Sequence, residues 1–227
     1  WKTAAAGKTP SQTVQVAAFG GNGRAFGDIS STMQHKSANL VAVAEVDEKR
    51  TDKVKQHFSK SKIYLNWREL LEKEEKNIDV VVVGTPDHMH AAISMSGMQL
   101  GKHCYCEKPL TRDVHECRII TEAAAKADVQ TQMGTQIHAG ENYRRVVELI
   151  QSGAIGPVSE VHTWVSRAWG WQSDADAKRN RDILSTQDTP TESQTPPEIL
   201  DWDLWIGPAP HRPFHSDYFP GPRWYRW

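Results

Sequence analysis

The sequence predicts an α/β protein whose first 137 residues form a doubly wound parallel sheet, followed by part of a second sheet domain. Three observations support this prediction. Short apolar runs alternate with helical patterns from residue 14 to residue 133, and glycine or polar residues stand at the junctions. The run 78–84 is rich in β-branched residues, as a strand buried on both faces requires.

Strands and helices alternate along this first part of the chain. The predicted strands are 14–19, 40–46, 63–65, 78–84, 103–106 and 129–133. Asp47 and Asn66 are the expected N-cap residues of the helices after the second and third strands, and Gly101 ends a helix that begins near residue 88. A further helix covers 111–126, and the whole pattern is that of a Rossmann-like sheet.

The chain changes character after this sheet. Residues 142–152 have the spacing of an amphipathic helix, which we expect to bridge two domains, with its apolar stripe made of Tyr143, Val146, Val147 and Ile150. Residues 157–168 alternate between apolar and polar, which predicts the first strand of a second sheet, and 172–197 is typical of a long surface loop. We therefore expect a first domain over 1–137 and a bridging helix with an incomplete second domain over 138–227.

Charge and composition exclude several function classes. The 27 Lys and Arg residues balance 28 Asp and Glu residues, which gives no electrostatic reason to expect nucleic acid or an anionic membrane as a partner. No run approaches the roughly 20 apolar residues that cross a bilayer. The cysteines lack the paired spacing of a zinc site, so no metal is expected; they are Cys104, Cys106 and Cys117. The compartment stays open between cytoplasmic and, if an export signal has been removed, periplasmic.

A glycine-rich turn follows the first predicted strand. Its residues are Gly20, Gly21, Asn22, Gly23, Arg24, Ala25, Phe26 and Gly27. Two registers fit a turn that holds a pyrophosphate at the N-terminus of the next helix, one over 20–25 with Asn22 in place of a glycine and one over 21–27 with one extra residue. In either register the backbone of residues 20–24 approaches a bound dinucleotide.

Glu45 supports this interpretation. It stands at the end of the second strand, where a carboxylate accepts hydrogen bonds from ribose hydroxyls and repels a 2′-phosphate. Arg50 lies close in sequence and weakens that repulsion. The sequence therefore predicts NAD as the cofactor, with NADP as the alternative.

Further polar candidates follow the fourth and fifth strands, at the edge where parallel sheets bind ligands. They are Thr85, Pro86 and His90 after one strand, and Glu107 and Lys108 after the other. The Lys108 ammonium can donate a hydrogen bond to a substrate hydroxyl or to a bound carboxamide, so it is the first catalytic candidate. His90 is the second, and for His90 packing within its own helix is an equally good interpretation.

Several motifs of the sequence together resemble one enzyme family. They are Gly84-Thr85-Pro86-Asp87-His88-x-His90, Gly101-Lys102-His103, Glu107-Lys108-Pro109-Leu110 and Gly153-x-Ile155-Gly156. Their order and spacing over about residues 14–170 resemble the glucose-fructose oxidoreductase and inositol dehydrogenase family, Gfo/Idh/MocA. Residues 202–210 and 212–214 resemble a bacterial branch of it, many of whose members are exported.

The resemblance implies a nicotinamide cofactor on the first domain and a sugar, inositol or sugar derivative as substrate. It places Lys108 at the nicotinamide and substrate, assigns Gln136 to the cofactor contacts, and suggests a cis peptide bond between Lys108 and Pro109. It also implies that the second domain is α+β, with an open, largely antiparallel sheet whose outer face makes homo-oligomer contacts.

The sequence departs from the family pattern at two points. Asn22 stands where a glycine is usual. The Asp and His that family members place four residues apart on a helix of the second domain have no match, so we expect the chain to correspond to the N-terminal half to two-thirds of an enzyme and to be inactive by itself. His138 lies in the stretch where family members place substrate or nicotinamide contacts.

These inferences leave three functions. The leading one is an NAD(P)-dependent dehydrogenase that transfers a hydride between a nicotinamide and a sugar or polyol carbon. The second is an NAD-dependent glycoside hydrolase or lyase that oxidises its sugar transiently. The third is a non-catalytic dinucleotide-binding protein.

Overall fold

A computed structural model describes residues 13–164, 173–179 and 190–219 of the chain. These residues form two compact units. The first contains the chain up to Thr135 together with Pro197–His211, and the second contains Gln136–Pro196 and the residues from Arg212 onward. The first unit ends two residues before the predicted boundary at 137, and it also includes 197–211, which the prediction placed in the second domain.

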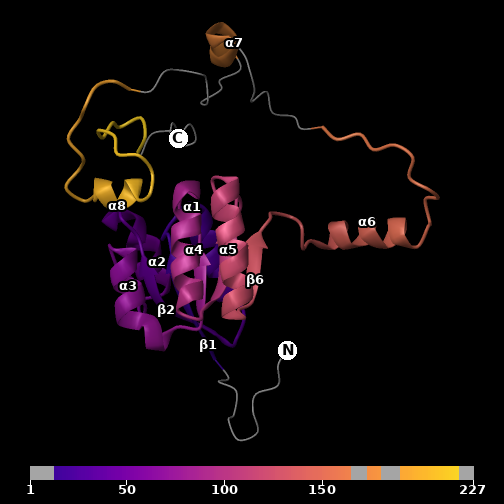
Figure 1. The fold of residues 1–227 in the computed structure, drawn as a ribbon, viewed down its shortest axis with the longest axis horizontal. Helices are drawn as coiled ribbons and strands as arrows, with labels where there is room; N and C mark the ends of the chain where they lie inside the picture. The colour runs from indigo at the N-terminus through magenta and orange to yellow at the C-terminus, as the bar shows by residue number, and fades with distance from the viewer. Residues whose placement is uncertain (1–12, 165–172, 180–189, 220–227) are drawn as a thin grey trace, which may run out of the picture. The chain divides into compact units, whose positions relative to one another are not determined.

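The first unit is built on a six-stranded sheet in the order β3-β2-β1-β4-β5-β6, and every neighbouring pair is parallel. Figure 1 shows β6 at one edge of this sheet, beside α5. The strands are β1 Val14–Phe19, β2 Ala38–Ala44, β3 Lys62–Tyr64, β4 Val80–Val83, β5 His103–Glu107 and β6 Thr131–Gly134. The strand order reverses between β1 and β4, which makes their carboxyl ends the expected ligand edge. The predicted doubly wound Rossmann-like fold is confirmed.

Helices connect these strands. In the first unit they are α1 Gly23–Thr32, η1 Glu48–Thr51, α2 Asp52–His57, α3 Trp67–Glu74, η2 Glu75–Asn77, η3 Asp87–Met89, α4 His90–Gln99, α5 Val114–Ala127 and α8 Trp202–Ile206. The side chains of Asp47 and Asn66 accept hydrogen bonds from Lys49 N and Arg68 N, as expected of N-caps. Helix α5 begins three residues later than predicted because Asp113 caps it, accepting from Glu116 N.

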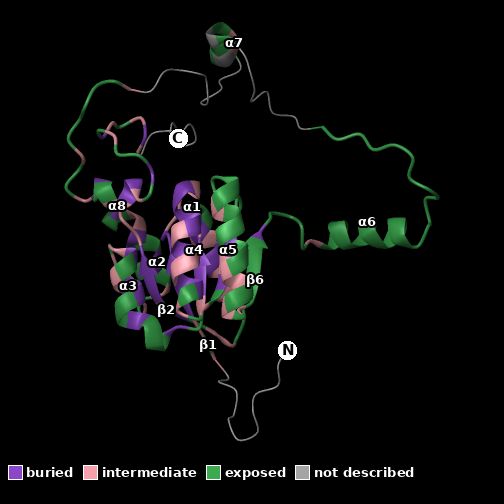
Figure 2. Cartoon of the chain, in the orientation of Figure 1, coloured by how far each residue is buried: buried purple, intermediate pink, exposed green. Residues whose placement is uncertain are grey.

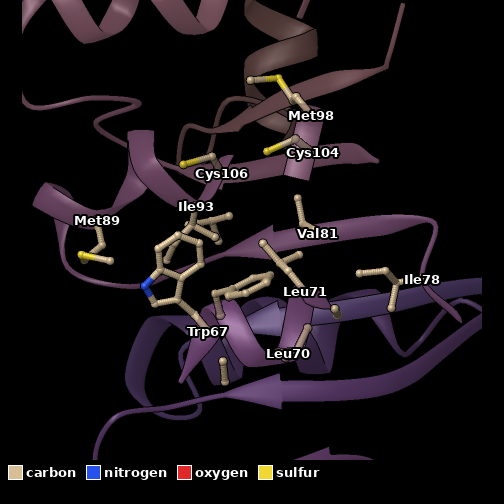
Figure 3. Packing of buried hydrophobic residues seen from close by; sticks show 14 of the residues in the cluster. Trp67, Leu70, Leu71, Ile78, Val81, Met89, Ile93, Met98, Cys104 and Cys106 are labelled. Atoms are coloured by element: carbon tan, nitrogen blue, oxygen red, sulfur yellow. The ribbon is translucent and has the colours of Figure 1, made fainter. Parts of the chain in front are cut away.

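The central strands of the sheet are buried on both faces, as the β-branched run predicts, whereas the edge strand β6 is exposed over Thr131–Met133. On one face α3, α4 and α5 pack over a cluster that includes Trp67, Leu70, Val81, Ile93 and Cys106 (Figure 3). On the other face α1 and α2 contribute Ile29 and Val54 to a second cluster with Val16, Val43 and Val82. Figure 2 shows the resulting buried strands between the helices.

The second unit is more exposed. Helix α6 Glu141–Gln151 forms as predicted, but its apolar stripe is about half exposed, with Tyr143 at 48% and Ile150 at 46% (Figure 2). Residues 157–164 form no strand, because a strand exists only when a neighbour completes its hydrogen-bond ladder, and 165–168 lie outside the described residues. The open second sheet is therefore not seen. Within the predicted polar loop, Asp174–Arg179 forms α7.

Segment 197–211 is the one large packing feature that the sequence pattern did not predict. Leu200, Trp202, Trp205 and Ile206 are all at least 93% buried. The backbone of Leu200 bridges Asp47, and the Trp202 and Trp205 rings stack at 4.8 Å. The bridge to Asp47 joins the segment to the loop after β2, and a contact of His88 with Trp205 O joins it to the loop after β4. Among the described residues no helix is long and apolar enough to span a membrane.

The close packing of α4 on β4 generates a stability prediction. A Cβ on Gly97 would lie 2.7 Å from Cγ2 of the buried Val81, whereas one on Gly27 in α1 would meet nothing within 4 Å. Gly97→Ala should therefore lower the free energy of unfolding by about 1–3 kcal/mol. Gly27→Ala, the matched control, should raise it by about 0.5–1 kcal/mol because it only restricts the unfolded chain. Denaturant unfolding measures both, and equal stabilisation by the two variants would show that the α4 contact is not tight.

Candidate functional site

The carboxyl edge of the sheet brings together the site residues predicted from the sequence, with one exception. Gly20, Gly21, Asn22, Gly23 and Arg24 follow β1, Glu45 and Arg50 follow β2, Thr85, Pro86 and His90 follow β4, and Glu107 and Lys108 lie at the end of β5. Gln136 is exposed and belongs to the second unit, so its cofactor contact stays a prediction.

The turn after β1 adopts the first of the two predicted registers. Gly20 has a φ of +100°, and a Cβ there would lie 2.8 Å from Cβ of Ala25. A Cβ on Gly84, at the end of β4, would lie 2.8 Å from Cα of Ala25. Ala25 therefore occupies the position where small residues let the helix approach the strands, and Gly27 makes no such contact.

Asn22 replaces the usual glycine by acting as the N-cap of α1. Its backbone is extended, and its Oδ1 accepts a hydrogen bond from Gly23 N at 2.8 Å. The N–H groups of Arg24 and Ala25, in the same first turn, have no partner among the described residues. Gly23 has a φ of +56°, and a Cβ there would meet nothing within 4 Å. Open space thus faces a helix N-terminus with unused donors, as anion binding requires.

Glu45 is held beside this turn. Its Oε2 accepts from Gly21 N at 2.9 Å and its Oε1 accepts from Asp47 N at 3.2 Å. Burial raises the pKa of Glu45, and these two N–H groups oppose the rise. Arg50, whose guanidinium lies 3.4 Å from the Asp47 carboxylate, lies on the same loop. A carboxylate has about four lone-pair positions, so Glu45 keeps acceptor capacity for a diol.

A charge cluster with two buried carboxyl groups and a half-exposed guanidinium lies between α1 and β5. The Arg24 guanidinium is 2.9 Å from Asp28 Oδ1 and 3.0 Å from Glu107 Oε1, and Tyr105 donates its hydroxyl to Glu107 Oε1 at 3.1 Å. Both carboxyl groups are at least 95% buried. Burial, followed by the charge of Glu107, raises the pKa of Asp28 to about 6. A Cβ on Gly134 would lie 2.4 Å from Glu107 Oε1, so β6 also closes around this cluster.

Lys108 follows this cluster directly. Its side chain is exposed and has no hydrogen bond or ion pair within the part of the chain that the structure describes. The peptide bond between Lys108 and Pro109 is cis, as expected. The main chain on either side is anchored, since Glu107 is held as described and Pro109 O lies 2.6 Å from His90 Nδ1.

The loop after β4 carries two buried histidines and a buried hydroxyl. His90 Nε2 lies 2.8 Å from Thr85 O, while Thr85 Oγ1 is buried without a partner in the structure. His88 Nε2 lies 2.7 Å from Trp205 O, and burial lowers the pKa of His88, which favours a neutral ring that donates to that carbonyl. The His88 contact was missed from the sequence. The tryptophans after residue 200 indicated that this segment packs against another part of the chain. The sequence does not show which residue they contact.

A match to a known family identifies the family of the chain. The family model described as "Oxidoreductase family, NAD-binding Rossmann fold" matches residues 14–135, which is more than half of the chain. The chain belongs to the Gfo/Idh/MocA family. The predicted family, fold and NAD cofactor are therefore confirmed at this level.

Individual relatives are more distant. The alpha-N-acetylgalactosaminidase of Shewanella oneidensis is 27% identical over 154 residues, which cover 64% of this chain and 33% of that protein. A glycosyl hydrolase family 109 protein of Shewanella sp. strain ANA-3 is also 27% identical, with the same coverage. The match thus spans about a third of the length of these curated relatives.

Solved Gfo/Idh/MocA structures share the fold. The scyllo-inositol dehydrogenase of Lactobacillus casei, with bound NAD(H) and scyllo-inositol, has a TM-score of 0.57 and 23% identity, covering 63% of this chain and 42% of that chain. An oxidoreductase of Agrobacterium radiobacter in complex with NAD+, L-tartaric acid and magnesium has a TM-score of 0.59 and 20% identity, with the same coverage.

The raised pKa of Asp28 generates a pH prediction. Between the unfolded pKa of about 3.9 and the folded pKa of about 6, the folded chain binds more protons than the unfolded chain, so the free energy of unfolding falls as pH rises. Asp28→Asn removes this slope and should stabilise the protein above about pH 6, by on the order of 2 kcal/mol.

Denaturant unfolding from about pH 4 to pH 8 measures the effect. Asp52→Asn, at an exposed position in the first turn of α2, is the control and should run parallel to wild type. A difference between Asp28→Asn and wild type that does not vary with pH would contradict the prediction.

Proposed function

We propose that the first unit binds NAD for the transfer of a hydride between the nicotinamide and a carbon of a sugar, inositol or sugar derivative. One observation carries this proposal. The unused N–H groups of α1, the Glu45 carboxylate and the Lys108 amine lie along one carboxyl edge of the sheet, in a chain of an NAD-binding oxidoreductase family.

The residues present fit the cofactor. The main chain of the turn is open to close approach at Gly23, where a Cβ would meet nothing within 4 Å, and the Thr85 hydroxyl is a buried donor without a partner at the same edge. Glu45 would accept hydrogen bonds from the adenine ribose, and the first turn of α1 would bind the pyrophosphate. When bound, NAD supplies the hydride acceptor at its nicotinamide ring.

Lys108 is the residue proposed to act on the substrate. Its amine would donate a hydrogen bond to the reacting hydroxyl and orient it, while the anchored main chain holds the amine in place. This assignment explains why an exposed lysine stands between two residues that are so firmly fixed.

A second function is favoured by the names of the curated relatives, which include an alpha-N-acetylgalactosaminidase and family 109 glycosyl hydrolases. In that case the same hydride transfer would be temporary, and the net reaction would be cleavage of a glycoside. A panel of sugars, inositols and glycosides with NAD separates the two. Net NADH formation supports the dehydrogenase, release of the aglycone without net NADH supports the hydrolase, and absence of any NAD binding refutes both.

Glu45 generates a prediction about cofactor choice. We expect NADH to bind at least about tenfold more tightly than NADPH, because the carboxylate repels a 2′-phosphate. Glu45→Gln should narrow this ratio by weakening NADH binding and improving NADPH binding. Fluorescence titration of both cofactors measures it. Glu48→Gln, on the exposed side of η1, is the control and should keep the wild-type ratio. Tighter binding of NADPH than of NADH by wild type would overturn the prediction.

Lys108 generates a prediction about turnover. With a substrate found in the panel, Lys108→Met should lower kcat by about tenfold or more, since it removes the donor and keeps most of the side-chain volume. The Kd for NAD should stay within about twofold. Lys102→Met, directly before the first residue of β5, where the Lys102 amine donates to Glu75 O, is the control. Turnover within about threefold of wild type would remove Lys108 from the mechanism.

A further inference from the structure

His90 connects two loops of the carboxyl edge. It is the first residue of α4 and is 99% buried. Its Nδ1 lies 2.6 Å from Pro109 O, in the loop after β5, and its Nε2 lies 2.8 Å from Thr85 O, in the loop after β4. One ring thus spans the gap between two loops that have no sequence continuity.

The partners of His90 define what it can do. Carbonyl oxygens only accept hydrogen bonds, so a ring nitrogen that bonds to one must donate. A neutral imidazole has a single N–H, so both hydrogen bonds form together only when each ring nitrogen carries a proton. Both nitrogens face the protein, and neither is left to exchange a proton with a substrate in this arrangement. The geometry therefore does not support the catalytic role predicted for His90. It points to a role in positioning the residues that the ring contacts.

We propose that His90 is a positioning residue that fixes the Lys108 main chain by donating from Nδ1 to Pro109 O. On the other side of Lys108, Glu107 is held by Arg24 and by the Tyr105 hydroxyl. Lys108 itself is exposed, so its amine is placed by these two anchors and not by contacts of its own. The anchoring of the Lys108 main chain does not depend on the proposed function. The effect on a bound nicotinamide rests on the proposed function.

Two amide side chains can separate the two His90 contacts. The amide nitrogen of asparagine is two bonds from Cβ, as Nδ1 of histidine is, and that of glutamine is three bonds away, as Nε2 is. His90→Asn therefore keeps a donor for Pro109 O, and His90→Gln keeps one for Thr85 O. His90→Ala removes both donors.

The experiment uses the 227-residue chain and three readouts. Hydrogen exchange of the peptide covering Glu107–Thr111 reports the order of the Lys108 loop. The fluorescence of bound NADH reports the nicotinamide environment, and the Kd of ADP-ribose, which lacks nicotinamide, reports the rest of the site. His88→Asn is the matched control, because His88 is equally buried two residues earlier and bonds instead to Trp205 O.

We expect His90→Ala and His90→Gln to speed exchange over Glu107–Thr111 by about tenfold or more, and His90→Asn and His88→Asn to stay within about threefold of wild type. The first two variants should also lose most of the NADH fluorescence change, with the ADP-ribose Kd within about twofold of wild type. A purely structural role would weaken ADP-ribose binding as well and would not distinguish asparagine from glutamine.

Equal exchange in His90→Asn and His90→Gln would overturn the proposal, as would wild-type exchange in His90→Ala. If His90→Ala does not fold, the asparagine and glutamine pair still decides the outcome. If wild type binds neither NADH nor ADP-ribose, the proposed function fails, while the exchange measurement still tests the anchoring of the Lys108 loop.

Discussion

The contact of Ala25 with Gly20 and Gly84 is the packing constraint on which the site depends. A Cβ on either glycine would lie 2.8 Å from an atom of Ala25, so any larger residue pushes α1 away from the ends of β1 and β4. Such a shift of α1 would also move the N–H groups of its first turn and its N-cap residue, Asn22. Arg24 would also lose its reach to Glu107 at 3.0 Å. The same close approach thus sets the anion site and the charge cluster.

The charge cluster of Arg24, Asp28 and Glu107 links the position of α1 to the end of β5. Asp28 and Glu107 face one guanidinium, and two buried carboxylates with one cation would leave an uncompensated charge. Burial and the charge of Glu107 accordingly raise the pKa of Asp28 to about 6, so this group takes up a proton below about that pH. Glu107 in turn fills the space that a side chain at Gly134 would need. Residues of α1, β5 and β6 therefore determine where the main chain of Lys108 begins.

The sequence predicted what local chemistry determines and missed what distant contacts determine. The strands follow from apolar runs, and the caps at Asp47 and Asn66 follow from residues adjacent to their helices. The register of the glycine turn stayed open because it depends on Gly84, about 60 residues away. Segment 197–211 groups with the first unit through contacts such as that of His88 with Trp205, and a separation of 117 positions leaves no local pattern that could predict it. The strand expected at 157–168 needs a neighbour that the pattern cannot supply.

The short motif Thr85-Pro86-Asp87-His88-Met89-His90 contains residues that hold the loops of the site in place. From the sequence these residues were candidates for ligand contact, yet both histidine rings bond to backbone carbonyls. His88 holds segment 197–211, which also bridges the loop after β2, and His90 holds the loop after β5. His88 and His90 are only two residues apart, yet they stabilise loops on opposite sides of the carboxyl edge of the sheet. A buried ring with its nitrogens engaged keeps one geometry, and an exposed amine such as Lys108 needs such fixed neighbours to act at a defined point.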